Sequence, residues 1–167
     1  IEPLWGLDQE FVGSGASLLP ILQREAKTDA QKAAVESFGA AQSKDPMMVG
    51  AIDGPAIDSL ASAFAGNAIV GEIMTALRMT SAIYAPYTRR TGRFYEANLK
   101  RENYMKSNFV AAYNRAKSKL GRDPRVLVKL GGNHAMRVIN DTNLPAFGNF
   151  AAEWGHGQNI RVVNIMV

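Results

Sequence analysis

The chain has 167 residues, of which 47% are hydrophobic, a composition typical of a globular domain rather than a disordered chain. It contains no cysteine, which excludes disulfides, thiolate zinc sites and cysteine nucleophiles. No run approaches the roughly 20 consecutive apolar residues that a membrane-spanning helix needs, and no secretory signal opens the sequence. The sequence therefore predicts a soluble protein without a membrane partner. Its compartment stays open, because an export signal would lie upstream of Ile1.

Basic residues give the chain a formal net charge of +4, and the excess lies between residues 89 and 125. Such clustering raises nucleic-acid binding as a hypothesis. However, Glu96 and Glu102 interrupt the basic run, and no helix-turn-helix or RNA-recognition pattern accompanies it. Lysines late in a helix commonly form a solvated face. We therefore expect no nucleic acid among the partners.

The first half of the chain reads as one short strand followed by helices. Residues 4–8 are the predicted strand, which ends at Asp8. Apolar residues at the helical period then predict four helices, over about 17–26, 28–42, 56–64 and 69–84. Thr28 and Asp29 stand where helix N-caps are expected. Pro86 is expected to end the fourth helix.

The second half of the chain contains the longest predicted helix, over residues 94–120, which Gly121 should close. Residues 125–130 are rich in β-branched and aliphatic side chains and run into a pair of glycines. This pattern is typical of a buried strand that feeds a tight turn. Residues 144–154 are predicted to form a loop and a short helix, and residues 160–167 a third strand.

The order of strands and helices favours an α/β fold with a mainly parallel sheet on which the helices pack. Only three strands are predicted, whereas a typical sheet has roughly 5 to 6. The sequence also begins without methionine just before a strand and stops at Val167 inside one. We therefore expect residues 1–167 to be a single α/β domain and the C-terminal portion of a longer chain, with a missing N-terminal segment that completes the sheet. An engineered or processed start is the alternative.

His134 is the first candidate for chemistry, because it follows a predicted strand and the glycines Gly131 and Gly132. Ligands of open α/β sheets bind at the carboxyl ends of strands, and Asp8 lies at another such end. The two glycines permit close backbone approach, so the imidazole could act as a general base, a nucleophile or a metal ligand. The alternative is a tight turn in which His134 only caps the next segment.

Glu102 is the second candidate. The apolar residues of the long helix fall on one arc: Tyr95, Leu99, Met105, Phe109, Tyr113, Ala116 and Leu120. Glu102 lies at the centre of that arc, where a buried charge costs several kcal/mol unless it is paired. It therefore has a partner or lines a cavity, and Lys106, one turn later, offers a simple i,i+4 pair. Arg101 and Asn108 share a flank of the arc and could together hold an oxyanion or carboxylate.

Two other patterns favour no chemistry. His156 lies in a glycine-flanked segment and is expected to be an exposed turn residue, and its spacing from His134 matches no zinc site. The Gly13-Ser14-Gly15 segment does not meet the spacing of a nucleophile elbow, so we reject a serine hydrolase.

Residues 101–108 (RENYMKSN) and 126–134 (VLVKLGGNH) resemble the paired C-terminal motifs of the erythromycin esterase-like and ChaN-like superfamily, whose relatives include the TraB and Tiki proteins. The family pattern is an arginine with a nearby acid and a methionine one turn on, then a strand that ends in a glycine-containing turn and a histidine. The strand that ends at Asp8 looks like the family's mid-chain strand. The resemblance spans much of residues 4–167 in order, and its specific part is the two motifs.

The resemblance implies a three-layer α/β/α fold and a polar pocket at the strand ends, with His134, Arg101 and Glu102 in its wall. In the family, a further acid and histidine come from an N-terminal half that this sequence lacks. The esterase-like branch opens lactones without a metal, the Tiki branch is similar to metal-dependent peptidases, and the ChaN branch binds haem. Lys100 stands where TraB-like members often carry glutamate, which weakens the peptidase alternative.

These observations lead us to expect a hydrolase that acts on a small-molecule ester or lactone. His134 and Glu102 are the expected catalytic residues, with His134 activating water and the Glu102 carboxylate orienting the His134 ring. The expected substrate-binding residues are Arg101, Asn108, Asp8 and Asn133. No cofactor is needed in this hypothesis. The alternatives are a haem- or metal-binding protein without catalysis, a metal-dependent peptidase, and a structural or interaction domain.

Overall fold

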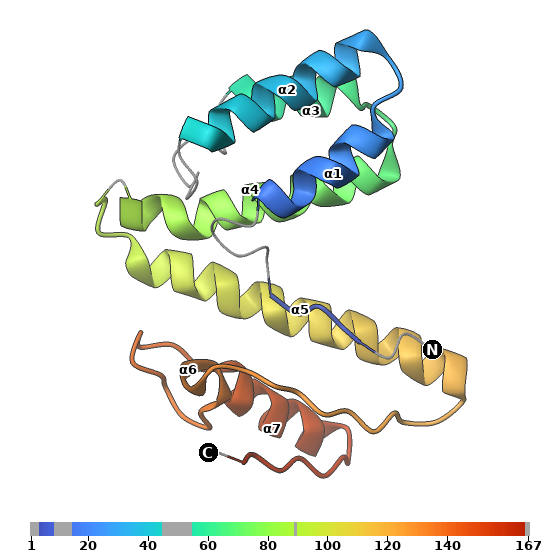
Figure 1. Ribbon diagram of the computed structural model, residues 1–167. Coiled ribbons are helices and arrows are strands. Elements are labelled where there is room, and N and C mark those ends of the chain that lie inside the picture. Colours follow the sequence, from blue (N-terminus) through green and yellow to red (C-terminus); the bar gives the residue numbers. More distant parts are fainter. Residues whose placement is uncertain (1–3, 9–14, 45–54, 89, 166–167) are drawn as a thin grey trace. The chain divides into compact units, whose positions relative to one another are not determined.

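The computed structural model describes residues 4–8, 15–44, 55–88 and 90–165 (Figure 1). Within these residues 67% of the chain is helical and no strand is formed, so the predicted three-layer α/β/α fold with a mainly parallel sheet is wrong. The chain divides into two compact units, and each is considered by itself below. We call Gln9–Arg93 the helical unit, and Ile1–Asp8 with Phe94–Val167 the motif unit. The expectation of a single domain within a longer chain stays a prediction.

The helical unit contains four of the predicted helices. They are α1 (Gly15–Glu25), α2 (Asp29–Lys44), α3 (Pro55–Ala63) and α4 (Ala68–Thr88). One continuous apolar core holds the unit together, and Leu22, Phe38 and Leu60 are fully buried in it. The period of the apolar residues predicted these helices correctly, because each helix turns one apolar stripe towards the same core.

Side-chain caps fix where two of these helices begin. The Thr28 hydroxyl accepts a hydrogen bond from the Gln31 amide (3.2 Å), and the Gln31 side chain accepts one from the Thr28 amide (3.1 Å). This reciprocal capping box confirms Thr28 as the predicted N-cap of α2. Asn67 caps α4 by accepting a hydrogen bond from the Val70 amide (3.1 Å). In contrast, Pro86 does not end α4, which continues to Thr88, because a proline in the last turn removes only a single N–H donor.

The motif unit is built on α5 (Phe94–Leu120), whose bounds are those predicted. Gly121 follows it in the left-handed region (φ 66°), where glycine carries no steric penalty, and its amide donates to the Lys117 carbonyl. Two further helices, α6 (Gly132–Ala135) and α7 (Phe147–Gly157), follow in the chain. The aromatic core includes Phe109, whose ring lies 5.3 Å from Phe147 and 5.4 Å from Trp154 in edge-to-face contacts.

The described residues of the three predicted strands are extended chain that forms no ladder, and residues 166–167 of the third lie outside the described residues (Figure 1). We call residues 4–8, 124–131 and 160–165 the first, second and third extended segments. Alternate side chains pack on the aromatic core: Trp5 and Leu7, Val128 and Leu130, and Ile160. The apolar side chains that led to the strand predictions are therefore half packed on a core. The prediction failed because a strand also needs a neighbour for its backbone, and the described residues supply none.

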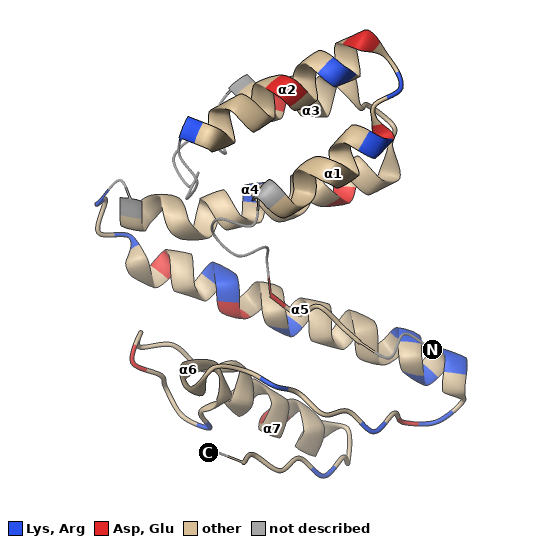
Figure 2. Cartoon of the chain, in the orientation of Figure 1, with Lys and Arg blue, Asp and Glu red and all other residues tan. Residues whose placement is uncertain are grey.

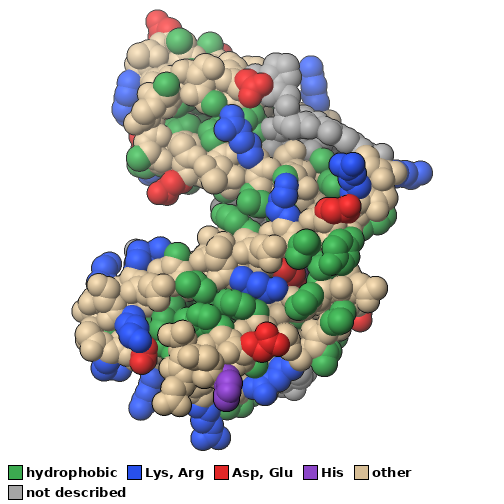
Figure 3. Space-filling view, turned by 180° about the vertical axis from the view of Figure 1, so that it is seen from behind, with side chains coloured by type: hydrophobic (Ala, Val, Ile, Leu, Met, Phe, Trp, Pro, Cys, Tyr) green, Lys and Arg blue, Asp and Glu red, His purple; other side chains and the backbone are tan. Residues whose placement is uncertain are grey.

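Apolar side chains that a sheet would cover lie exposed in the motif unit. Leu127 is 96% exposed, Leu4 87% and Ile165 79%. The space-filling view shows hydrophobic side chains at the surface among lysine and arginine side chains (Figure 3). The extended segments of the motif unit thus pack one side on the core and leave the other side exposed, without backbone pairing.

Candidate active site

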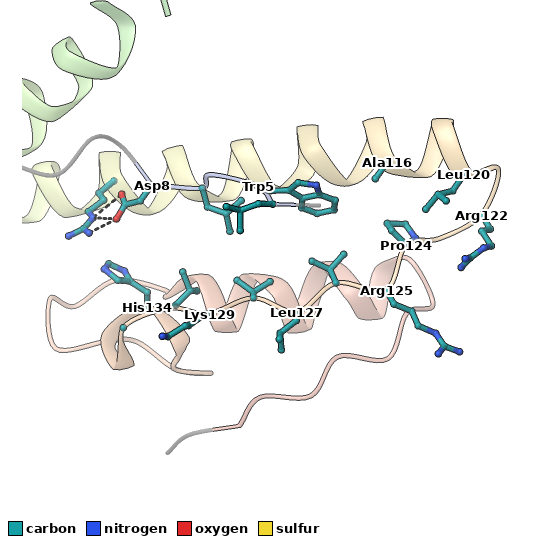
Figure 4. Close-up of a pocket in the computed structure, with 17 residues that line it drawn as sticks. Trp5, Asp8, Ala116, Leu120, Arg122, Pro124, Arg125, Leu127, Lys129 and His134 are labelled. Carbon is teal, nitrogen blue, oxygen red and sulfur yellow. Dashed lines mark hydrogen bonds and ion pairs between the residues drawn. The ribbon is translucent and has the colours of Figure 1, made fainter. Parts of the chain in front are cut away.

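A groove of about 1330 Å³ lies within the motif unit, between the first and second extended segments and α5 (Figure 4). Trp5 and Leu7 line it from the first segment, and Ala116 and Leu120 line it from α5. Both segments run against the direction of α5, and they end at the same end of the groove, where Asp8 and His134 lie. Their carboxyl ends therefore meet at one end of the groove, where the predicted polar residues gather.

Glu102 and His134 are in direct contact at this end. The Nδ1 atom of His134 lies 2.7 Å from the Oε1 atom of Glu102. Glu102 is only 1% exposed, whereas His134 also lines the groove. A carboxylate accepts a hydrogen bond, so this contact favours the tautomer in which Nδ1 donates and Nε2 carries the lone pair. The partner that the burial of Glu102 requires is thus His134, and not Lys106.

Asn140 completes the surroundings of Glu102, and sequence reasoning missed it. Its Nδ2 atom donates to Oε1 of Glu102 (3.3 Å). The Asn140 Oδ1 atom accepts hydrogen bonds from the amides of Thr142 (3.0 Å) and Leu144 (3.2 Å), which fixes the side chain. The signal was a turn-forming run, Asn-Asp-Thr-Asn, at residues 140–143. Within the described residues, the second carboxylate oxygen of Glu102, Oε2, is buried without a hydrogen bond.

Arg101 and Asp8 form a forked ion pair at the same end of the groove (Figure 4). The Nε atom of Arg101 lies 3.1 and 3.0 Å from the two carboxylate oxygens of Asp8, and Nη2 also donates to the carboxylate. The two side chains are 25% and 32% exposed. Both were predicted to bind substrate, and both line the groove. Asp8 offsets the charge of Arg101, so a ligand in the groove would meet an oriented ion pair rather than an isolated cation.

The other two predicted substrate-binding residues lie elsewhere. Asn108 donates from Nδ2 to the Leu7 carbonyl (2.8 Å) and so ties the first extended segment to α5. It thereby positions Asp8 at the groove end. Asn133 is exposed on α6 and is not among the residues that line the groove. Lys106 donates a hydrogen bond to the Pro145 carbonyl (2.7 Å). His156 is exposed as expected, but it belongs to the C-terminal end of helix α7 and not to a loop.

Close packing of α6 against α7 holds His134 in place. A Cβ atom at Gly148, in the first turn of α7, would lie 2.1 Å from the Ala135 carbonyl oxygen. Glycine is therefore required there for α7 to pass beside the residue that follows His134. The Asn164 side chain also donates to the Ala135 carbonyl (2.7 Å), which ties α6 to the third extended segment.

Hydrogen bonds around Asp123 fix the start of the second extended segment. Asp123 accepts hydrogen bonds from Lys117 (2.7 Å) and from the Tyr113 hydroxyl (2.9 Å). The hydrogen bond from Lys117 and then that from Tyr113 lower the pKa of Asp123. Burial, followed by the hydrogen bond to Asp123, raises the pKa of Tyr113 to about 12. The turn that leads from α5 to the groove is thus held by a charge-assisted network.

Neither the described residues nor the comparisons with known proteins identify a cofactor or a family. Among the described residues, no three potential histidine, cysteine, aspartate or glutamate ligands gather in one place. None of the helices in the described ranges is long and apolar enough to cross a bilayer. No protein-family model, curated protein or solved structure matches the chain. The resemblance to the esterase-like and ChaN-like superfamily therefore stays a prediction carried by two motifs.

Proposed function

We propose that the motif unit hydrolyses an ester or lactone, with His134 as the general base. The observation that carries the proposal is the 2.7 Å contact between His134 and the buried carboxylate of Glu102 at the end of a groove. A histidine held by a buried acid, with its second nitrogen available to a substrate site, is the arrangement that general-base catalysis needs.

In the proposed reaction, Nε2 of His134 removes a proton from a water molecule as its oxygen attacks the carbonyl carbon. Glu102 holds the ring in the required tautomer and stabilises the imidazolium that forms. The tetrahedral intermediate then expels the alkoxide, which takes the proton back from His134. The acid product thus gains the OH group of the water and the alcohol gains its proton, so the reaction needs no oxidant or cofactor.

Arg101 is proposed to stabilise the negative charge that develops on the carbonyl oxygen. Asp8 holds the guanidinium in a fixed orientation, so little reorganisation is needed when that charge appears. The neighbouring groove surface includes Trp5, Leu7 and Leu130, which suits an apolar acyl or lactone ring. The proposed substrate class is therefore a small ester or lactone with an apolar body.

The experiment is a hydrolysis assay of the purified protein on a panel of chromogenic esters and lactones, with and without EDTA. We expect His134→Ala to lower kcat/KM by about 10²- to 10⁴-fold, the usual contribution of a general base. Glu102→Gln should lower it less, because the amide keeps the shape but loses the charge. His156→Ala is the matched control, since His156 is exposed, and it should leave turnover unchanged.

Equal turnover by His134→Ala and the unaltered protein, both folded by circular dichroism, would overturn the proposal. Activity that EDTA abolishes would favour the metal-dependent peptidase or metal-binding alternative. A Soret band after incubation with haem, without hydrolysis, would favour the haem-binding alternative.

A further inference from the structure

The second extended segment has the chemistry of a sheet strand but no strand beside it. Within the part of the chain that the structure describes, residues 124–130 make no backbone–backbone hydrogen bond. Val128 and Leu130 pack on the aromatic core, while Leu127 is 96% exposed. Unpaired backbone groups and bare apolar side chains on an extended segment are a template for another extended chain.

The groove gives that chain a place to lie. It runs alongside the second extended segment, with Ala116 and Leu120 of α5 and Trp5 of the first segment also in its lining. A polypeptide in extended form would pair its backbone with residues 125–130 and lay alternate side chains on this apolar surface. The opposite end of the groove, with His134, would stay open to a small substrate.

The charged residues on the outward face of the second extended segment indicate which charge a partner strand should carry. Arg125, Leu127 and Lys129 alternate along it and point away from α5 in the close-up (Figure 4). Neither Arg125 nor Lys129 has an ion pair with any residue that the structure describes. Figure 2 shows basic residues at the end of α5 and along the segment, with Asp123 between them. Cross-strand pairs of opposite charge stabilise a sheet, so the complementary strand carries acids opposite Arg125 and Lys129.

A second copy of the chain fits this edge poorly. In an antiparallel pair centred on Leu127, Arg125 of one copy would face Lys129 of the other. In a parallel pair in register, each cation would face its own counterpart. Like charges directly opposite each other destabilise strand pairing, so both arrangements are disfavoured.

We propose that the second extended segment is a docking edge for an extended polypeptide strand of a partner protein, with acidic residues flanking an apolar residue on its outer face and apolar residues on its inner face. The strand hydrogen-bonds along residues 125–130, places its acids against Arg125 and Lys129, and buries its inner side chains on the groove surface. No step of this interaction involves His134, but the strand would share the groove surface at Trp5 and Leu130 with the proposed substrate.

The test uses a labelled synthetic peptide of this pattern, Ac-Thr-Val-Glu-Val-Leu-Val-Glu-Val-Thr-NH2, whose palindromic order fits either direction. We expect saturable binding by fluorescence anisotropy and slowed amide hydrogen exchange at residues 125–130. A peptide with lysine in place of both glutamates should bind about tenfold more weakly, the expected effect of reversing two cross-strand charge pairs. A peptide with N-methyl groups on alternate residues should not bind, because it cannot form the ladder.

Charge-reversal variants complete the test. Arg125→Glu combined with Lys129→Glu should reverse the preference between the acidic and basic peptides, and both positions are exposed, so the fold should hold. Lys119→Glu is the matched control on α5 outside the groove lining and should leave the preference unchanged. The proposal is overturned if the acidic peptide does not bind, if the N-methylated peptide binds equally well, or if residues 125–130 are protected by self-association alone.

Discussion

The helical unit and the motif unit differ in how far they bury their apolar side chains. The four helices of the helical unit bury their stripes in one core, which includes Leu22, Phe38 and Leu60. The motif unit buries one side of each extended segment and leaves Leu127 and Ile165 exposed. A helix satisfies its backbone within itself and needs only a surface to pack on, whereas an extended segment also needs a neighbour for its backbone. The described helices of the helical unit thus share one apolar core, and the motif unit has an unpaired edge.

The largest expected effect is the loss of a core side chain from the helical unit. Phe38→Ala removes a fully buried ring and leaves a cavity, so we expect the free energy of unfolding to fall by about 3–5 kcal/mol. Urea denaturation followed by helical circular dichroism measures this change. A loss below about 1 kcal/mol would contradict the closed core described for this unit.

A methyl group at Gly148 tests the packing that places His134. In Gly148→Ala the new Cβ would meet the Ala135 carbonyl at 2.1 Å, so α6 or α7 must shift. We expect a loss of about 1–3 kcal/mol in stability, with a fall in any His134-dependent activity. Gly71→Ala is the control in the helical unit, because nothing lies within 4 Å of its added Cβ, and it should be neutral or slightly stabilising. Equal effects of the two substitutions would contradict the account.

The hydroxyl of Tyr113 gives the motif unit a pH dependence at high pH. Its pKa in the folded protein is raised from 10.0 to about 12, so the contribution of the protonated hydroxyl is complete below pH 10 and is lost as the pH rises through about 12. Tyr113→Phe should cost about 1 kcal/mol at neutral pH through the lost hydrogen bond to Asp123. The difference between the two proteins should narrow above pH 10. Denaturation at several pH values measures it, and a widening gap would refute the assigned cause.

The smallest expected effect falls on the exposed side of the second extended segment. Leu127→Thr should change the stability of the isolated protein by no more than about 0.5 kcal/mol, because Leu127 is 96% exposed. A large loss of stability would mean that Leu127 is buried in solution, and self-association at this edge would then be the explanation. Sedimentation of the unaltered protein distinguishes the two cases.

Local patterns predicted the helices and part of the site. The bounds of α5 were predicted from apolar spacing and Gly121, which act within a few residues. The central position of Glu102 on the apolar arc predicted its burial, and the strand-and-turn pattern singled out His134. The helical period is fixed, so the sequence shows which side chains of a helix are buried. A buried carboxylate is costly unless it is paired, so the sequence also predicts that Glu102 has a partner.

The remaining features depend on contacts between distant residues. Strand pairing requires a neighbouring chain, which the apolar alternation of residues 125–130 does not specify. The pairing of Arg101 with Asp8 and the hydrogen bond from Asn140 to Glu102 join residues far apart in sequence. Lys106 was a possible partner of Glu102 by spacing, yet the Pro145 carbonyl binds its ammonium group instead. Spacing along one helix fixes which side chains are neighbours, but not which partner from elsewhere in the fold lies closer.

The most direct test of the central claim is the tautomer of His134, measured by long-range proton–nitrogen NMR at neutral pH with His156 as the internal reference. We expect that the neutral ring of His134 carries its proton on Nδ1, facing Glu102, and that Glu102→Gln weakens this preference. His156, which is exposed, should show the ordinary mixture. A His134 ring protonated on Nε2, or one indistinguishable from His156, would contradict the Glu102–His134 pair and the hydrolytic site built on it.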